Sequence, residues 1–300
     1  MWFKQLSFFT IDSKNIPTAE LLEEKLATAA FAPVTGLALS SEGFAAAVPF
    51  APEHVFTAGK SMRIALKKEE KILPAAVVRE VLEEKVAEIQ AAEARAVGRR
   101  EKMELKEQIT DDLLPRAFSK SSHTVLIFAP ENGFLLVNQS AANRSENAVS
   151  RLREALGGLE VKLPDTVQSP SALMTEWLLA GDAAGGFSLD EDCELKGTGE
   201  AAAVVRVSRQ DLTADEVVQH VKNGKIVTRL GLVWQDKVSF VLGADLSLKR
   251  IRFLDMLQEE AADAGDDVAS LTAATQIVMT ETLSVMLCEL LKHLGGLIER

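Results

Sequence analysis

The sequence is poor in the residues that build metal and redox centres. It contains four histidines and two cysteines, Cys193 and Cys288, and it has no tyrosine. The histidines are scattered and no two of them stand at metal-ligand spacing, so a zinc site is not expected. Two cysteines far apart are typical of free thiols in a reducing compartment. We therefore predict a cytoplasmic protein with no metal and no cofactor.

Long apolar runs are also missing. No run of about 18 apolar residues occurs, so neither a membrane-spanning helix nor a membrane partner is expected. Residues 1–6 lack the basic start, apolar core and small-residue cleavage site of a secretory signal. With 47% hydrophobic and 26% charged residues, a chain of 300 residues is long enough for two domains or for two or three modules in a row.

Negative charge is in excess, but it is unevenly distributed. The formal net charge of −11 argues, taken alone, against binding to nucleic acid. However, residues 222–252 carry seven basic and two acidic side chains, whereas residues 255–300 carry two basic and nine acidic ones. A clustered basic face matters more for nucleic-acid binding than the total charge. An acidic exterior around a basic inner face would produce this distribution, and so would chance.

The longest charged helical pattern lies between Pro74 and Pro115. Its apolar residues recur at three- and four-residue spacing before Gly98 and again after it: Val77, Val78, Val81, Leu82, Val86 and Ile89, then Met103, Leu105 and Ile109. This spacing predicts two amphipathic helices. Folded back at Gly98, they would form a projecting helical hairpin with little core of its own.

The remaining elements are clustered by type. Strands are predicted at 2–11, 37–39, 44–48, 54–66, 124–129, 133–138, 159–163, 187–195 and 201–208, and as a meander at 225–252. Helices are predicted near 17–29, 145–156, 169–179, 213–223 and 272–294, with a capping box from Thr213 to Glu216. Because strands and helices do not alternate strictly, we expect an α+β fold with antiparallel sheets. We divide the chain into a first module (1–73), the hairpin (74–115) and a second module (116–300), either of which can be discontinuous.

Catalytic motifs are incomplete. Gly59-Lys60-Ser61 resembles the end of a phosphate-binding loop, but His54 stands where that loop needs its first glycine. We interpret this stretch as a turn that enters a strand. No Gly-x-Ser-x-Gly elbow occurs, and the acidic run Asp190-Glu191-Asp192 is interpreted as a solvated turn. The sequence therefore predicts a protein that is not an enzyme.

The basic residues of the predicted meander have two interpretations. Alternate side chains of a strand share a face, so the basic residues could form either a solvated outer face or a surface that contacts phosphates: Lys225, Arg229, Lys237, Lys249, Arg250 and Arg252. Such a surface would bind the nucleic-acid backbone without reading bases. Because the aromatic residues of this region are expected in the core, a platform for stacking bases is less favoured.

Phe118 stands out because it lies between Arg116 and Lys120, just after Pro115. It is either a hydrophobic staple beneath a loop or an exposed aromatic anchor for a second subunit.

Several separate blocks, in order along the chain, carry a family resemblance. They are Trp2-Phe3-Lys4, Lys68-Glu69-Glu70-Lys71-Ile72-Leu73-Pro74, Leu113-Leu114-Pro115-Arg116-Ala117-Phe118-Ser119, Thr175-Glu176-Trp177, Arg209-Gln210-Asp211-Leu212-Thr213 and Ser247-Leu248-Lys249-Arg250. From end to end, the chain resembles the RdgC family of recombination-associated proteins. The resemblance implies a bacterial, nucleoid-associated protein that binds double-stranded DNA without sequence preference and limits recombination by RecA. It leaves single-stranded DNA open as a further partner.

The resemblance also implies a ring-shaped homodimer with a positively lined hole. It places Phe118 at the dimer interface and Arg209 and Gln210 in DNA binding or an adjoining contact. Ser208 and Arg209 stand where other members carry two lysines, so one positive charge is missing. Together, the residues expected to bind DNA are Arg116, Lys120, Arg209, Gln210, Lys225, Arg229, Lys249, Arg250 and Arg252. The alternative is a protein-interaction scaffold that acts directly on a recombination protein.

Overall fold

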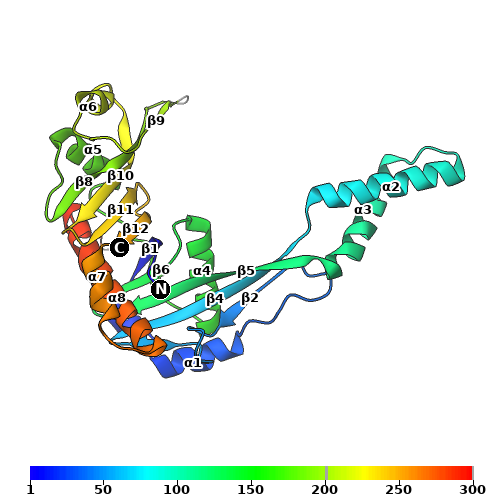
Figure 1. Ribbon diagram of the computed structural model, residues 1–300, viewed down its shortest axis with the longest axis horizontal. Coiled ribbons are helices and arrows are strands. Elements are labelled where there is room, and N and C mark those ends of the chain that lie inside the picture. Colours follow the sequence, from blue (N-terminus) through cyan, green and yellow to red (C-terminus); the bar gives the residue numbers. More distant parts are fainter. Residues whose placement is uncertain (200–201, 299–300) are drawn as a thin grey trace. The chain divides into compact units, whose positions relative to one another are not determined.

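The computed structural model describes residues 1–199 and 202–298, which belong to two compact units (Figure 1). Unit 1 comprises Met1–Thr28, Ala46–Ala65 and the chain from Thr124 onward, and unit 2 comprises Ala29–Ala45 and Leu66–His123. Eight α-helices and a large antiparallel sheet occur in the described residues. The predicted α+β class is therefore confirmed. The module boundaries at 73/74 and 115/116 stay a prediction, and residues 200, 201, 299 and 300 of the second module lie outside the described residues.

Unit 1 is built on one long sheet. Its strands lie in the order β4-β5-β6-β1-β12-β11-β10-β8-β9, and the short strands β3 and β7 pair with β4 and β1. The elements of the first half are β1 (Gln5–Ile11), α1 (Ala19–Thr28), β3 (Phe56–Ala58), the start of β4 (Ser61–Ile72), the end of β5 (Phe118–Ala129), β6 (Phe134–Val137), α4 (Ala142–Leu156) and β7 (Val161–Lys162). Strand β1 joins the two halves because it pairs with β6 along most of its length and with β12 at Gln5 and Leu6.

The second half of unit 1 contains the meander that the sequence predicts. Its elements are α5 (Pro170–Ala180), β8 (Phe187–Lys196), β9 (Val204–Val207), α6 (Asp215–Lys222), β10 (Ile226–Trp234), β11 (Val238–Gly243), β12 (Leu248–Phe253), α7 (Asp255–Ala262) and α8 (Val268–His293). Strands β10, β11 and β12 pair antiparallel in sequence order, as expected. Helix α7 is an addition that the sequence analysis missed.

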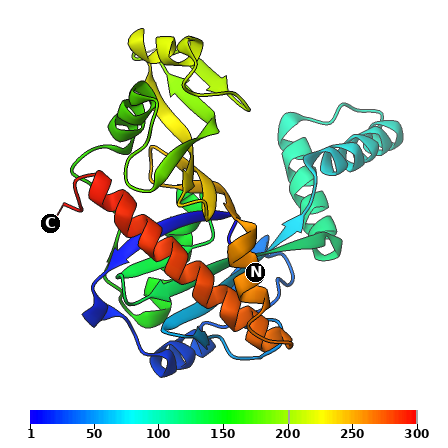
Figure 2. The same cartoon turned by 60° about the vertical axis from the view of Figure 1, so that its left-hand side comes forward.

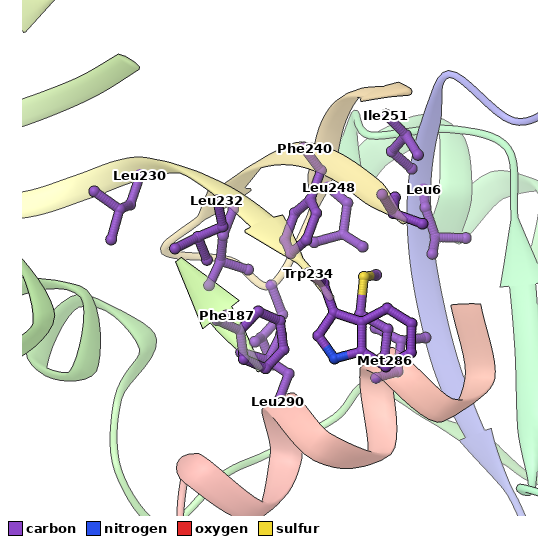
Figure 3. Packing of buried hydrophobic residues seen from close by; sticks show 14 of the residues in the cluster. Leu6, Phe187, Leu230, Leu232, Trp234, Phe240, Leu248, Ile251, Met286 and Leu290 are labelled. Carbon is purple, nitrogen blue, oxygen red and sulfur yellow. The ribbon is translucent and has the colours of Figure 1, made fainter. Parts of the chain in front are cut away.

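The core of the second half lies between this sheet and α8, which crosses one face of the sheet (Figure 2). Leu230, Leu232 and Trp234 of β10 point to the same side as Phe240 of β11 (Figure 3). They pack against α8 residues such as Met286, and the indole nitrogen of Trp234 donates a hydrogen bond of 2.7 Å to Glu289. Because successive side chains of a strand alternate, this packing leaves the opposite face of β10–β12 to the polar residues.

Helix α8 is long and strongly apolar. Among the described residues, α8 is the one helix that is long and apolar enough, judged by length and composition only, to cross a membrane. Its side chains at Met279, Leu283, Met286, Leu287 and Leu290 are buried in the core of unit 1. The packing of this helix on the sheet therefore accounts for its apolar composition.

Local turn chemistry explains two further differences from the predicted elements. The expected single strand at 54–66 is a hairpin of β3 and β4, because Gly59 adopts a φ of +56° and turns the chain. This outcome confirms that Gly59-Lys60-Ser61 is a turn entering a strand. The predicted capping box of α6 is wrong: Ala214 is the N-cap residue, and Thr213 instead donates to Asp211.

Unit 2 contains β2 (Ser40–Ala45), the end of β4, α2 (Ala75–Glu93), α3 (Arg99–Leu113), a short 3₁₀ turn (Leu114–Arg116) and the start of β5. Helices α2 and α3 contact each other (Figure 1), and Lys85 and Asp112 pair at 4.0 Å. Small apolar side chains are buried here, namely Val78, Val86, Val97, Ile109 and Leu114. The two helices thus have more core than the sequence suggested, although Val77 and Met103 are exposed.

Candidate nucleic-acid interface

The exposed face of the meander carries basic side chains because of a bulge in β12. Ser239 of β11 pairs with Arg252, and Val241 pairs with Lys249, so β12 has one more residue than β11 between these pairs. Arg250 adopts a φ of +53° at this point. The extra residue keeps Lys249 and Arg252 on the face opposite the core and still lets Ile251 reach the core.

A three-residue ion-pair network crosses the neighbouring strands. Glu194 of β8 lies directly opposite Arg206 of β9 and Arg229 of β10. Its Oε2 atom accepts from Arg206 Nε at 2.8 Å and from an Arg229 guanidinium nitrogen at 3.2 Å. These interactions, led by the hydrogen bond from Arg206, lower the pKa of Glu194 below its usual range. Glu194 is therefore ionised at neutral pH.

The acidic run predicted to be a solvated turn lies inside β8. Leu230 pairs with Cys193 and Leu232 with Leu189, so three residues, 190–192, face the single residue Gly231. A Cβ atom at Gly231 would lie 3.0 Å from the carbonyl oxygen of Asp192, so glycine allows the bulged strand to approach. Asp192 accepts a hydrogen bond of 2.7 Å from Arg250 and another from the hydroxyl of Ser208. The solvated-turn interpretation is thus wrong.

These side chains line one hollow with a volume of about 370 Å³. Its wall includes four basic residues (Arg206, Arg229, Lys249 and Arg250) and the two acidic partners Asp192 and Glu194. Positive charge is therefore in excess at the hollow, although the whole chain is acidic. Burial, together with the charge of Asp192, raises the pKa of the Cys193 thiol in this wall to about 11. This thiol is protonated at neutral pH and is a weak nucleophile.

Comparison with known proteins identifies the family. A family model described as "RdgC: Putative exonuclease, RdgC" matches residues 1–297. The chain belongs to the RdgC family. RdgC relatives named "Recombination-associated protein RdgC" include those of Neisseria gonorrhoeae (strain NCCP11945), 62% identical over 296 residues and 99% of each chain, and of Laribacter hongkongensis (strain HLHK9), 50% identical over 298 residues and 99% of each chain.

A further RdgC relative, from Pseudomonas syringae pv. syringae (strain B728a), is 43% identical over 303 residues, which cover 99% of this chain and 98% of the relative. Membership of the RdgC family supports a role in DNA recombination. The family description names an exonuclease and the relatives' names do not, and neither name is itself evidence of catalysis. In the part of the chain that the structure describes, no cluster of three histidine, cysteine or acidic residues is arranged to hold a metal ion.

The structure brings only some of the sequence-predicted residues of this RdgC chain together. Arg229, Lys249 and Arg250 line the hollow, and Arg252 is exposed on the same strand as the latter two. Lys225 is half-buried beside the ring of His220, with 3.4 Å between Lys225 Nζ and His220 Nδ1. It does not contribute to the wall of the hollow.

Arg209 and Gln210 follow β9 near the same hollow. Arg209 is exposed and has a φ of +56°, next to Ser208 in the wall. Gln210 is held by two hydrogen bonds. Its backbone N–H donates to the backbone carbonyl of Glu191 at 3.2 Å, and its side-chain amide donates to the carboxylate of Glu216. A role for Gln210 in binding DNA would require this side-chain contact to break.

The other predicted residues belong to unit 2. Arg116 ends the 3₁₀ turn, and Phe118 and Lys120 lie at the start of β5, where residues 118–123 are all exposed. The Phe118 side chain is 86% exposed, so the staple beneath a loop is wrong. Its role as a subunit anchor stays a prediction, as do the DNA contacts of Arg116 and Lys120.

Sequence reasoning missed Arg206 and Glu194. Arg206 lies outside the basic segment 222–252, and Glu194 counts as one more acidic residue of a negative chain. One signal was present: three valines around Arg206, at 204, 205 and 207, favour a strand. Nothing in the local sequence says that this strand pairs with β8.

Proposed function

We propose that this RdgC-family protein binds the DNA backbone without sequence preference. The binding surface is the hollow on the face of strands β8–β12 opposite the core. The single observation that carries the proposal is the convergence of Arg206, Arg229, Lys249 and Arg250 on one surface of a chain whose net charge is −11. Clustered arginines and lysines bind phosphates and release counterions, which supplies most of the affinity of non-specific DNA binding.

The chemistry of the wall favours phosphates over bases. Lysine and arginine contact phosphate oxygens in any sequence, and contacts of this kind position a protein without specifying a site. The described residues of the wall include no aromatic ring on which an unpaired base could stack. Double-stranded DNA is therefore the proposed ligand, and single-stranded DNA is the second substrate to test.

At the level of the assembly, we propose a homodimeric ring that encircles duplex DNA. Phe118 would anchor one subunit on the other, because an exposed aromatic side chain is the kind of residue that dominates interfaces. A contact repeated by two-fold symmetry closes without further copies. Helices α2 and α3 would form the projecting hairpin that brings this region to the partner.

Such a ring would limit RecA-mediated recombination by occupying the DNA on which RecA assembles. This mechanism needs no chemical step, so we propose a protein that is not an enzyme and that is associated with the nucleoid in the cytoplasm. Incubation of labelled DNA with Mg²⁺ would detect nuclease activity. Loss of intact DNA would contradict this part of the proposal.

One observation favours a second candidate, a scaffold that acts directly on a recombination protein. Asp192 and Glu194 already pair with three of the basic residues of the wall. If these ion pairs satisfied the arginines, DNA would bind weakly and the exposed Phe118 would be left to contact a protein.

The dependence of DNA binding on salt distinguishes the two candidates. The affinity for a random-sequence duplex should fall steeply with salt, with a log–log slope of about −0.9 for each phosphate contacted. Replacing Lys249 and Arg250 with alanine should weaken binding equally for different sequences and make the slope shallower. An affinity that is flat from low to moderate salt would reject DNA binding and favour the scaffold.

A further inference from the structure

The carboxylate of Glu194 lies beneath the two arginines that it binds. Its side chain is 16% exposed, against 75% for Arg206 and 44% for Arg229. The hydroxyl of Thr228 lies 3.2 Å from the other carboxylate oxygen, Oε1, and 3.2 Å from the Glu194 carbonyl. Both carboxylate oxygens therefore have partners, and Glu194 is held in place from strands on either side.

This arrangement leaves positive charge and hydrogen-bond donors on the outer side. Two guanidinium groups share one carboxylate, so the network carries a net charge of +1. A guanidinium has five N–H donors in a planar fork, and the contacts to Glu194 use only some of them. Without the carboxylate, the two arginines would repel each other and their long side chains would spread.

We propose that Glu194 is a positioning residue for DNA binding, which holds Arg206 and Arg229 as a pair that takes one backbone phosphate at the β9 side of the hollow. This inference rests on the proposed function and adds two residues, Arg206 and Glu194, that sequence reasoning did not find. A phosphodiester oxygen accepts charge-assisted hydrogen bonds from arginine in the geometry that suits a carboxylate.

The opposite role for Glu194 would be a competitor that occupies the phosphate position and must leave. Burial and bonding separate the two roles. A competitor would lie over the arginines and be more exposed than they are, whereas Glu194 is the least exposed of the three. It is also fixed by the register of β8 with β9 and β10 and by Thr228. Glu194 thus lies behind the phosphate position.

The test is Glu194→Gln, measured by fluorescence anisotropy with a random-sequence duplex over a range of salt concentrations. The substitution removes a negative charge, so long-range electrostatics alone would tighten binding. We expect instead a loss of about three- to tenfold, and a log–log salt slope shallower by about 0.9, the value for one phosphate. The matched control is Glu191→Gln, which removes an exposed carboxylate from the same strand. It should bind as tightly as the wild type or more tightly.

A second variant keeps the inference testable if Glu194→Gln fails to fold. Replacing Arg206 and Arg229 with alanine alters only exposed side chains and should weaken binding and flatten the slope in the same way. Where Glu194→Gln does fold, adding it to that background should cause no further loss. A further loss of similar size would assign Glu194 a general structural role and overturn the inference.

The inference and the proposed function fail in different ways. If the wild type binds DNA with a steep salt dependence but the Arg206/Arg229 variant binds equally well, only the inference is wrong. Unchanged or tighter binding by folded Glu194→Gln would also overturn it. If the wild type itself shows no salt-dependent binding, the proposed function is wrong.

Discussion

At the scale of single residues, the site depends on carboxylates as well as on cations. Glu194 pairs with Arg206 and Arg229, and Asp192 pairs with Arg250. These ion pairs restrict the motion of three long arginine side chains. Ordering an arginine in advance lowers the entropy lost when a ligand binds. An acidic residue can therefore favour an anionic ligand when it lies behind the cations.

The lowered pKa of Glu194 predicts a pH dependence of stability. A carboxyl group whose pKa is lower in the folded state stabilises the fold above its unfolded pKa, and this contribution is lost as the pH falls through the folded value. Because both arginines are more than a third exposed, the contribution should be about 1 kcal/mol or less. The wild type should therefore unfold at higher denaturant than Glu194→Gln at pH 7, with the gap closing under acidic conditions. A gap that stays constant down to pH 3 would contradict this assignment.

At the scale of elements, two bulges shape the site. The bulge in β12 places Lys249 and Arg252 on one face, and the larger bulge in β8 brings Asp192 to Arg250. Gly231 lies opposite the β8 bulge, where a Cβ atom would lie 3.0 Å from the carbonyl oxygen of Asp192, a tighter contact than most side chains make. One face of the meander therefore packs against the core, and residues on its other face line the hollow.

Gly231→Ala tests this link between fold and site. The added methyl would push against the β8 backbone, so we expect a loss of about 1–3 kcal/mol in the free energy of unfolding and weaker DNA binding as Asp192 shifts. The matched control is Gly197→Ala, where the nearest atom to a new Cβ lies at an ordinary 3.5 Å. Chemical denaturation of both variants gives the comparison. Equal stability of the two would show that the bulge does not need glycine.

The sequence predicts regular elements better than irregular ones, for physical reasons. The alternation of apolar residues predicts strands β10–β12 and the face on which Arg229 lies, because the spacing of apolar residues can be seen in the local sequence. Simple alternation fails at Arg250, since a bulge depends on the pairing with β11. The ion pairs of Glu194 depend on strands β9 and β10, whose partners are set by the whole sheet. Residues of this kind become visible only in the fold.

At the scale of the whole molecule, a chain with a net negative charge is proposed to bind DNA, which is also negatively charged. A net charge of −11 would oppose binding if charge were spread evenly, but four basic residues and only two acidic ones line the hollow. At physiological salt, charges further apart than about 8 Å are largely screened. The local excess at the hollow therefore governs contact with the backbone.

The proposed homodimer depends on Phe118, so substitution of this residue tests the assembly. Phe118→Ser should shift the proposed dimer towards the monomer by at least about tenfold in dissociation constant, because loss of an aromatic anchor costs about 2 kcal/mol or more. Sedimentation velocity over a dilution series measures this shift. Leu163→Ser, at another exposed apolar residue, is the control and should leave the dimer unchanged. Identical sedimentation of the wild type and Phe118→Ser at low concentration would contradict the anchor.

Site-specific photo-crosslinking tests the central claim most directly. A photoreactive amino acid at Ser208, an exposed residue in the wall of the hollow, is compared with the same amino acid at Leu163 in the presence of labelled random-sequence duplex. We predict a DNA adduct from position 208 that disappears at high salt, and little adduct from position 163. Adducts from position 163 with none from position 208 would contradict the claim that the hollow is the DNA-binding surface.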